Sequence, residues 1–559
     1  MNLAPRRPAP AVPLLVPLAA ALSVVLALAG CTAQDAGSDT TTETTTLTAP
    51  DTAPLPDGAQ ALDGASAPEA RGDQSFVPPY PEPYPEPGPV EPGGEEYDDS
   101  PESPFLDVAT SPLSTFSSDV DTASYSNLRR QVNQGVAPEG VRIEELVNYF
   151  DYDYPAPAAG AERPFSVTTE VAQAPWNPEH QLAMVGVQAT EALPTSEGNN
   201  IVFLLDVSGS MDEPDKLPLL AESFALLVEQ LDERDRVSIV TYAGDNRVVA
   251  DSVPGSEHGV LVDHLRSLRA GGSTGGAAGL TTAYELAEKN FVRGGNNRVI
   301  LATDGDFNVG PSSPAELTTL VEAERASGVY VSVLGFGMYN LKDSMMEAIA
   351  DHGNGNYAYI DTLAEARKVL VDEFGSTMFV VAQDLKLQVE LNPAVVGSYR
   401  LLGYDNRRLA DEDFDDDTKD AGDVGAGHSV TAFYELVPAG SDGSTGSDGD
   451  LEYSDREVGT SDDFMTVHVR YKSPDGGPSA ASTEAEFPVG AAAYTTTPSA
   501  DFEFASAVAE LGLIATGSEY RADANLDGAR ARAAGALGAD PYGLRAEFVD
   551  LVDAYRAMG

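Results

Sequence analysis

The sequence predicts an α/β fold, a doubly wound parallel sheet with β-rich segments on either side of it. Residues 201–205 (Ile-Val-Phe-Leu-Leu) form a continuous apolar run, which is typical of a strand buried on both faces. Similar runs recur at 237–242, 299–302 and 329–334, and helical apolar stripes separate them. This alternation at this spacing indicates a parallel sheet covered by helices on both faces.

The flanking elements follow from shorter patterns. A helical pattern over 128–150 predicts a small N-terminal helical unit, and period-two alternation predicts strands at 165–171 and around 183–187. Beyond residue 379 the alternation returns, and the chain ends in an apolar helical stripe. Those later strands are expected at 385–391, 430–436 and 465–471, and the stripe comprises Leu544, Phe548, Leu551, Val552 and Tyr555. Strand patterns on both sides of the α/β unit indicate that it is inserted into a β-sandwich-like domain.

The N-terminus has the pattern of an exported protein. Two arginines precede an apolar run over 11–29, which is typical of a signal peptide. The run ends in Leu28-Ala29-Gly30-Cys31, which resembles the bacterial lipobox. That resemblance implies that Cys31 is the lipid-modified first residue of an extracytoplasmic, membrane-anchored protein. The alternative is ordinary cleavage near Ala29 with an incidental cysteine.

We divide the chain into five parts. Residues 1–30 are the lipoprotein signal peptide, and 31–103 are a disordered acidic spacer, too rich in Pro and Thr to bury a core. Residues 104–196 form the N-terminal helical and β-strand region, and 197–376 form the α/β domain. Residues 377–559 form a C-terminal β-rich domain that ends in helices.

Composition excludes several classes of function. The 33 Lys and Arg residues face 89 Asp and Glu residues, which gives a formal net charge of −56. Nucleic-acid binding depends on basic residues that neutralise phosphates, so no nucleic-acid partner is expected. A single cysteine excludes zinc ribbons, iron–sulfur clusters and disulfide scaffolds. The glycine-rich segment 271–279 has no lysine, so no nucleotide site is expected either.

Oxygen-bearing side chains gather where the buried strands end. Asp206, Ser208 and Ser210 follow the first strand, Asp304 follows another, and Thr274 lies in the glycine-rich loop. Carboxyl ends of parallel strands meet at one edge of a sheet, where such folds bind ligands. Carboxylates and hydroxyls without His or Cys suit Mg²⁺, with Mn²⁺ or Ca²⁺ as alternatives. The simpler alternative is that these side chains only cap the helices that follow.

The spacing of these residues resembles the von Willebrand factor type A (vWA) domain. Its metal-ion-dependent adhesion site has the pattern Asp-x-Ser-x-Ser, then Thr, then Asp, and Asp206, Ser208, Ser210, Thr274 and Asp304 match it. The resemblance implies direct metal ligation by the two serines. It implies ligation by the threonine and the two aspartates either directly or through water.

Longer phrases resemble the bacterial YfbK-type vWA lipoproteins. These phrases lie at 119–125, 214–220, 296–310 and 354–361, and the resemblance runs from about residue 104 to the C-terminus. It implies a Rossmann-like vWA domain within a larger lipoprotein.

Other candidate sites have weaker patterns. Residues 523–528 (Asp-Ala-Asn-Leu-Asp-Gly) fit the first half of a calcium loop, but its twelfth position is Ala534 rather than Glu. The six histidines show no ligand spacing, and we interpret His468 as an ordinary surface residue. These patterns predict no second metal site.

We expect a binding protein rather than an enzyme. A serine-hydrolase elbow needs Gly two residues before its serine, and here that residue is Asp206 before Ser208. Only two of the five site residues are carboxylates, so a bound cation keeps affinity for an Asp or Glu of a protein partner. The alternatives are a metal-dependent hydrolase and a structural cell-envelope protein without ligand exchange at the metal.

Overall fold

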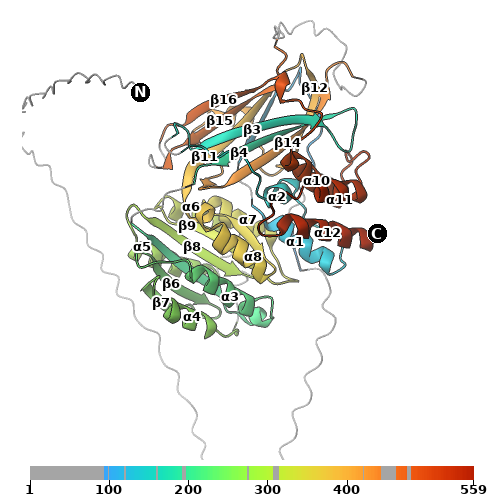
Figure 1. The fold of residues 1–559 in the computed structure, drawn as a ribbon. Helices are drawn as coiled ribbons and strands as arrows, with labels where there is room; N and C mark the ends of the chain where they lie inside the picture. Colours follow the sequence, from blue (N-terminus) through green and yellow to red (C-terminus); the bar gives the residue numbers. More distant parts are fainter. Residues whose placement is uncertain are drawn as a thin grey trace, which may run out of the picture. The chain divides into compact units, whose positions relative to one another are not determined.

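The computed structural model describes residues 94–97, 100–118, 121–158, 161–191, 197–272, 276–305, 314–419, 421–441, 461–474 and 480–559. All of them belong to one compact unit, which begins at Pro85 (Figure 1). The predicted signal peptide, Cys31 and most of the spacer lie outside the described residues, and so does Thr274. In the part of the chain that is described, no helix has the length and apolarity that crossing a membrane requires.

The α/β domain is built on a six-stranded sheet, in the order β10-β9-β8-β5-β6-β7. Five strands are parallel, which confirms the predicted parallel sheet, and the edge strand β7 pairs antiparallel with β6. β7 and β10 were not predicted. The strands are β5 (Asn199–Asp206), β6 (Arg236–Tyr242), β7 (Arg247–Pro254), β8 (Asn296–Thr303), β9 (Tyr330–Phe336) and β10 (Tyr357–Ile360).

Helices cover both faces of this sheet (Figure 1). Alternate residues of β5 point to opposite faces, so Val202 and Leu204 enter one apolar core while Ile201, Phe203 and Leu205 enter the other. The first core is closed by α5 (Gly276–Lys289), α6 (Pro314–Arg325) and α7 (Asp343–His352). The second is closed by α3 (Leu217–Val228), α4 (His258–Arg266), α8 (Leu363–Arg367) and the π-helical turn η2 (Lys368–Asp372). The short helix α9 (Phe374–Met378) leads out of the domain.

A β-sandwich is formed by strands from both sides of the α/β domain. One sheet has the order β1-β12-β14-β4-β3, and the other has β13-β11-β15-β16 with β2 also paired to β11. Because β4 pairs with β14 and β2 pairs with β11, the α/β domain is inserted into the sandwich. The strands are β1 (Leu106–Asp107), β2 (Leu113–Ser117), β3 (Phe165–Gln173), β4 (Gln181–Ala189), β11 (Val380–Leu391), β12 (Val396–Leu402), β13 (Val424–Gly425), β14 (Ser429–Pro438), β15 (Met465–Lys472) and β16 (Thr483–Val489).

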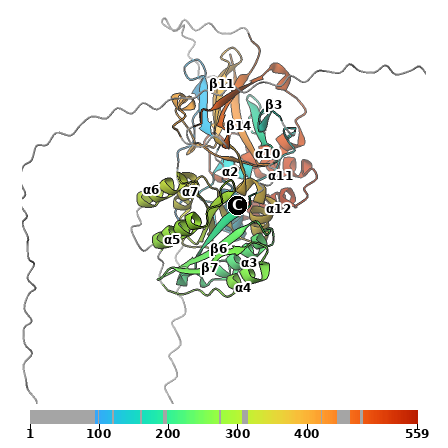
Figure 2. The same ribbon diagram turned by 90° about the vertical axis from the view of Figure 1, so that its left-hand side faces the viewer.

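Helices from the two ends of the described chain share one core. Phe150, Phe504 and Phe548 meet there edge to face, with ring centroids 4.9 to 5.7 Å apart. Figures 1 and 2 both show α2, α10, α11 and α12 lying together. The helices are α1 (Ala123–Asn133), α2 (Ile143–Asn148), α10 (Ala500–Ala515), α11 (Leu526–Gly535) and α12 (Leu544–Met558).

Buried arginines join this helical layer to the α/β domain. Arg129 of α1 lies 2.5 Å from Asp361 and 2.7 Å from Glu365, which stand at the end of β10 and in α8. Arg142, just before α2, lies 2.7 Å from Asp343 at the start of α7. These three charged contacts therefore fix the orientation of the inserted domain against the helices.

The first described residues, 94–97, form an N-terminal clip on the α/β domain. The Glu96 N–H donates to the Leu341 carbonyl at 2.9 Å, and the Asp343 N–H donates to the Glu96 carbonyl at 3.1 Å. Lys342 Nζ also donates to the Gly94 carbonyl at 3.0 Å and to Glu96 Oε1 at 2.7 Å. The chain thus enters the described fold along the segment just before α7.

Candidate metal centre

The predicted site lies at the carboxyl edge of the six-stranded sheet. β5 and β8 are hydrogen-bonded neighbours, β5 ends at Asp206, and Asp304 directly follows β8. The backbone of the glycine-rich segment folds against the first of these ends, because the Gly209 N–H donates to the Gly272 carbonyl at 3.1 Å. Two distant carboxylates therefore reach the same edge, as the strand pattern predicted.

Hydrogen bonds hold the oxygen atoms of the site close together. Ser208 Oγ and Ser210 Oγ are 2.9 Å apart, and the Ser208 N–H donates to Asp206 Oδ1 at 2.8 Å. Thr303 Oγ1 donates to Asp206 Oδ2 at 3.3 Å. Asp206, Ser208 and Asp304 are all buried. The structure thus brings together four of the five predicted ligands, while the fifth, Thr274, lies outside the described residues.

The helix-capping alternative is wrong for the first three residues. Ser208 stands at the start of the short 3₁₀ turn η1 (Gly209–Asp212), but its side chain makes no capping hydrogen bond. The next helix, α3, has Lys216 at its N-cap position and no side-chain cap. Helix capping therefore does not account for the position of the side-chain oxygens of Asp206, Ser208 and Ser210.

The electrostatics of the buried edge favour a bound cation. Burial raises the pKa of Asp206 to about 6, and the charge of Asp304 raises it as well. Among the described residues no basic side chain forms an ion pair with Asp206. A buried carboxylate without a counter-charge is costly, and a divalent cation coordinated by these oxygens would supply that charge. The donor set present therefore fits a hard divalent metal ion.

Lys216 is a member of the site that the sequence analysis missed. Its Nζ donates to Asp304 Oδ2 and to Asn340 Oδ1, both at 3.0 Å, and its side chain is buried. Lys216 and Asp304 are 88 positions apart, so only the packing of α3 against the sheet edge brings them together. Thr303 was missed too, although its place directly before Asp304 was a usable signal.

Two other sequence candidates have definite places in the structure. Asn525 caps α11 by accepting a hydrogen bond from the Gly528 N–H at 2.8 Å, which gives residues 523–528 a structural role. His468 of β15 lies beside Glu484 and Glu486 of β16, and one ligand atom from each falls within 4.8 Å of the others. The interpretation of His468 as an ordinary surface residue overlooked this cross-strand cluster, because the alternation within one strand does not show which side chains of the adjacent strand lie beside it.

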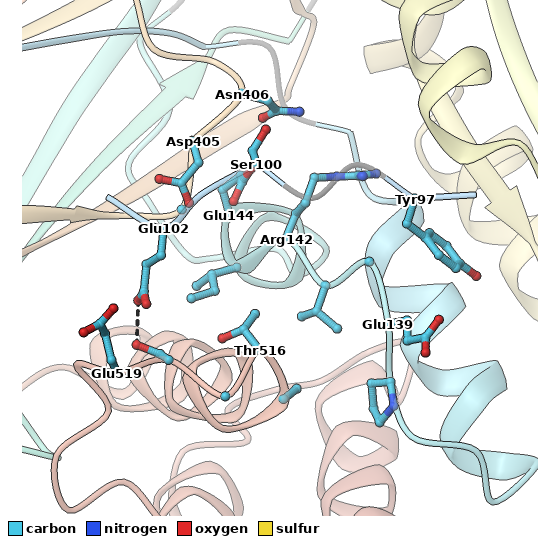
Figure 3. Close-up of a pocket in the computed structure, with 18 of the residues that line it drawn as sticks. Tyr97, Ser100, Glu102, Glu139, Arg142, Glu144, Asp405, Asn406, Thr516 and Glu519 are labelled. Carbon is cyan, nitrogen blue, oxygen red and sulfur yellow. Dashed lines mark hydrogen bonds between the residues drawn. The ribbon is translucent and has the colours of Figure 1, made fainter. Parts of the chain in front are cut away.

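An acidic cavity of about 870 Å³ lies away from the candidate metal ligands, among α2, the C-terminal end of α10 and residues 95–97 and 100–102 (Figure 3). Its lining includes four carboxylates that form no ion pair within the described part of the chain: Glu139, Glu144, Asp405 and Glu519. Burial raises the pKa of Glu144 to about 7. At the rim Ser518 Oγ donates to Glu102 at 2.5 Å, the dashed line in Figure 3. None of the four predicted metal ligands that the structure describes lines this cavity.

The fold and the Asp-x-Ser-x-Ser edge define a vWA-domain protein. The family model described as von Willebrand factor type A domain matches residues 200–373, and one described as von Willebrand factor matches 91–184. A third model, for the C-terminal part of the uncharacterized protein YfbK, matches 376–558. The chain is 43% identical over 477 residues to YfbK of Escherichia coli K12, which covers 83% of this chain and 81% of the relative. The protein therefore belongs to the YfbK family of vWA proteins.

Two further matches are more distant. Human inter-alpha-trypsin inhibitor heavy chain H4 is 30% identical over 177 residues, which are 30% of this chain and 18% of that protein. Among solved structures, a von Willebrand factor type A protein from Catenulispora acidiphila aligns with a TM-score of 0.37 at 15% identity, covering 80% of this chain and 91% of that one.

Proposed function

We propose that this protein is a membrane-anchored, extracytoplasmic vWA lipoprotein that binds a protein partner through a divalent cation. The cation would be held by Asp206, Ser208, Ser210, Thr274 and Asp304, with Mg²⁺ as the first expectation and Mn²⁺ or Ca²⁺ as alternatives. The observation that supports this most strongly is the buried Asp206 carboxylate, which lies beside two serine hydroxyls and forms no ion pair with a basic residue in the described ranges.

The charge balance explains why a partner would bind there. Two carboxylates neutralise a divalent cation formally, but Lys216 already pairs with Asp304. The site as a whole therefore keeps a positive charge when the cation is bound, on a chain whose net charge is −56. An Asp or Glu side chain from the partner would complete the coordination and neutralise that charge.

A chelator experiment tests the proposal. Proteins crosslinked to the membrane-bound protein would be recovered with and without EDTA, from wild type, Ser208→Ala and the control Ser256→Ala, whose serine is exposed and far along the chain. We expect the same partners in wild type and Ser256→Ala, and their loss in EDTA and in Ser208→Ala. Partners that persist in excess EDTA would contradict the proposal and favour a structural envelope role.

Metal binding itself is measured by thermal unfolding. A ligand that binds only the folded state stabilises it by about 2.7 kcal/mol at a hundredfold excess over its Kd. Mg²⁺ should therefore raise the Tm of wild type and Ser256→Ala, and much less that of Ser208→Ala. Equal shifts in all three would place the cation elsewhere on this acidic surface. Reproducible Mn²⁺-dependent hydrolysis that Asp206→Ala abolishes would instead support the metal-dependent hydrolase.

The membrane anchor is tested separately. Cys31→Ser should move the protein from the membrane fraction to the soluble extracytoplasmic fraction, because the thioether-linked lipid needs that sulfur. Thr32→Ser, one residue further, should leave the protein in the membrane fraction. Membrane retention of Cys31→Ser would contradict the lipid anchor and leave the cation proposal unaffected.

A further inference from the structure

Lys216 occupies a prepared position beside the candidate metal centre. Its ammonium group lies between Asp304 Oδ2 and Asn340 Oδ1, and only 6% of the residue is exposed. Lysine is rarely buried to this degree unless it is paired. The ammonium group of Lys216 is therefore stabilised by its hydrogen-bond partners and not by hydration.

The backbone near Lys216 is shaped to admit its long side chain. Gly337, just after β9, has a φ of +77°, and a Cβ there would lie 2.3 Å from Lys216 Cε and 2.4 Å from its Cγ. The Gly337 carbonyl is fixed by the Tyr359 hydroxyl, which donates to it at 2.7 Å. Any other residue at 337 would displace the lysine, so this glycine keeps a channel open between the sheet edge and α3.

We propose that Lys216 is a built-in counter-ion that stabilises the metal-free site and weakens its affinity for the divalent cation. Without metal, the ammonium group neutralises the buried Asp304. With metal, the same group repels the cation that Asp304 helps to hold. This inference rests on the proposed metal site and concerns the strength of binding there.

As a consequence, the charges of the two buried carboxylates are compensated in different ways. Asp206 has no basic partner in the described ranges and depends on the cation, whereas Asp304 is already compensated by Lys216. A fold with one compensated carboxylate does not need metal to form, so the cation can enter and leave a folded domain. Lys216 thus acts on the metal by its charge and by its pairing with Asp304, without being a ligand itself.

The test measures metal-free stability and metal affinity in the same variants. Lys216→Met keeps the length of the side chain and removes its charge, and Lys216→Gln keeps donors for Asp304 and Asn340. Full-length protein in detergent would be unfolded thermally in EDTA and titrated with Mg²⁺ and Mn²⁺ by calorimetry. The control is Lys342→Met, because Lys342 lies near the same edge but contacts Gly94 and Glu96.

Opposite changes in the two quantities are expected. The metal-free Tm of Lys216→Met should fall by about 5 °C, because Asp304 loses its buried counter-charge. Its Kd for the cation should fall by about tenfold, because the ammonium group no longer repels the cation. A purely structural role for Lys216 would weaken both stability and metal binding. Adding Asp304→Asn to Lys216→Met should restore the metal-free Tm, since residue 304 then carries no charge that needs a counter-ion.

The possible failures are distinguishable. If wild type binds the cation and Lys216→Met binds it equally or more weakly, the counter-ion role is overturned while the proposed function stands. If neither wild type nor Lys216→Met nor Lys216→Gln binds a divalent cation, the counter-ion role and the proposed function both fail. Where Lys216→Met does not fold, Lys216→Gln gives the same comparison.

Discussion

Replacing Arg129 by Met should weaken the packing of the inserted domain against the helical layer and so lower the free energy of unfolding. Arg129 carries the contact between α1 and the end of β10, with Nη2 2.5 Å from Asp361 Oδ1 and 2.7 Å from Glu365 Oε2. Its guanidinium also lies over the Tyr149 ring, 5.8 Å from the centroid. Both carboxylates are buried, so neither would regain full hydration if the arginine were lost.

The magnitude follows from that burial. Removing one partner of a buried ion pair costs about 3–5 kcal/mol, because a charge is left without compensation. Glu365 keeps the Tyr149 hydroxyl, which donates to it at 2.6 Å, and Met fills part of the arginine's volume. We therefore expect the lower end of the range, a loss of about 3 kcal/mol in the free energy of unfolding.

Urea denaturation of wild type, Arg129→Met and Arg266→Met measures this loss. Arg266 pairs with Glu222 at 2.9 Å on the surface, where both side chains are about half exposed, and such solvated pairs contribute little to stability. Burial already raises the pKa of Asp361, and without Arg129 this carboxyl should take up a proton more readily. The loss of stability in Arg129→Met should therefore be smaller at pH 5 than at pH 7.5. Equal, small losses in the two variants at both pH values would refute the reasoning.

The remaining predictions concern a buried acid and two glycines. Because the folded-state pKa of Glu144 is raised from 4.5 to about 7, its favourable contribution is complete below pH 4.5 and is lost as pH rises through 7. Glu144→Gln should therefore be more stable than wild type at pH 8 by up to about 3 kcal/mol. Urea denaturation in which the stability difference between Glu144→Gln and wild type is the same at pH 5 and pH 8 would contradict this. Gly355→Ala should cost about 3 kcal/mol, because a Cβ would lie 1.8 Å from the Val331 carbonyl oxygen. Gly259→Ala, exposed in α4 with open space around it, should instead raise stability by about 0.5 kcal/mol, and a Tm that falls in both variants would count against the steric argument.

Local patterns predicted the central elements well. The apolar runs that become β5, β6, β8 and β9 are buried on both faces, so their hydrophobicity is continuous and easy to recognise. Asp206 and Asp304 could be placed at one edge because each follows such a run directly. Metal binding by the predicted set stays a prediction, and so do the domain boundaries and the lipidation of Cys31.

Elements that depend on distant partners could not be predicted. β7 is an exposed edge strand with an irregular register against β6, and β10 has only four residues, so neither leaves a clear alternation. The single helical layer formed by α1, α2 and α10–α12 results from packing between the two ends of the described chain. Lys216 belongs to the same class, since its role depends on tertiary contacts with Asp304 and Asn340.

The N-terminal clip has a mechanical consequence. If Cys31 carries the lipid, tension between the membrane and a captured partner travels along the spacer and first meets, among the described residues, the N-terminal clip, where Gly94 and Glu96 are hydrogen-bonded to residues 341–343. That segment directly follows Asn340, which accepts a hydrogen bond from Lys216. It also lies close to Gly305, the residue after Asp304, because a Cβ on Gly305 would be only 2.6 Å from the Lys342 backbone nitrogen. The load is therefore applied beside the candidate metal centre rather than to the β-sandwich.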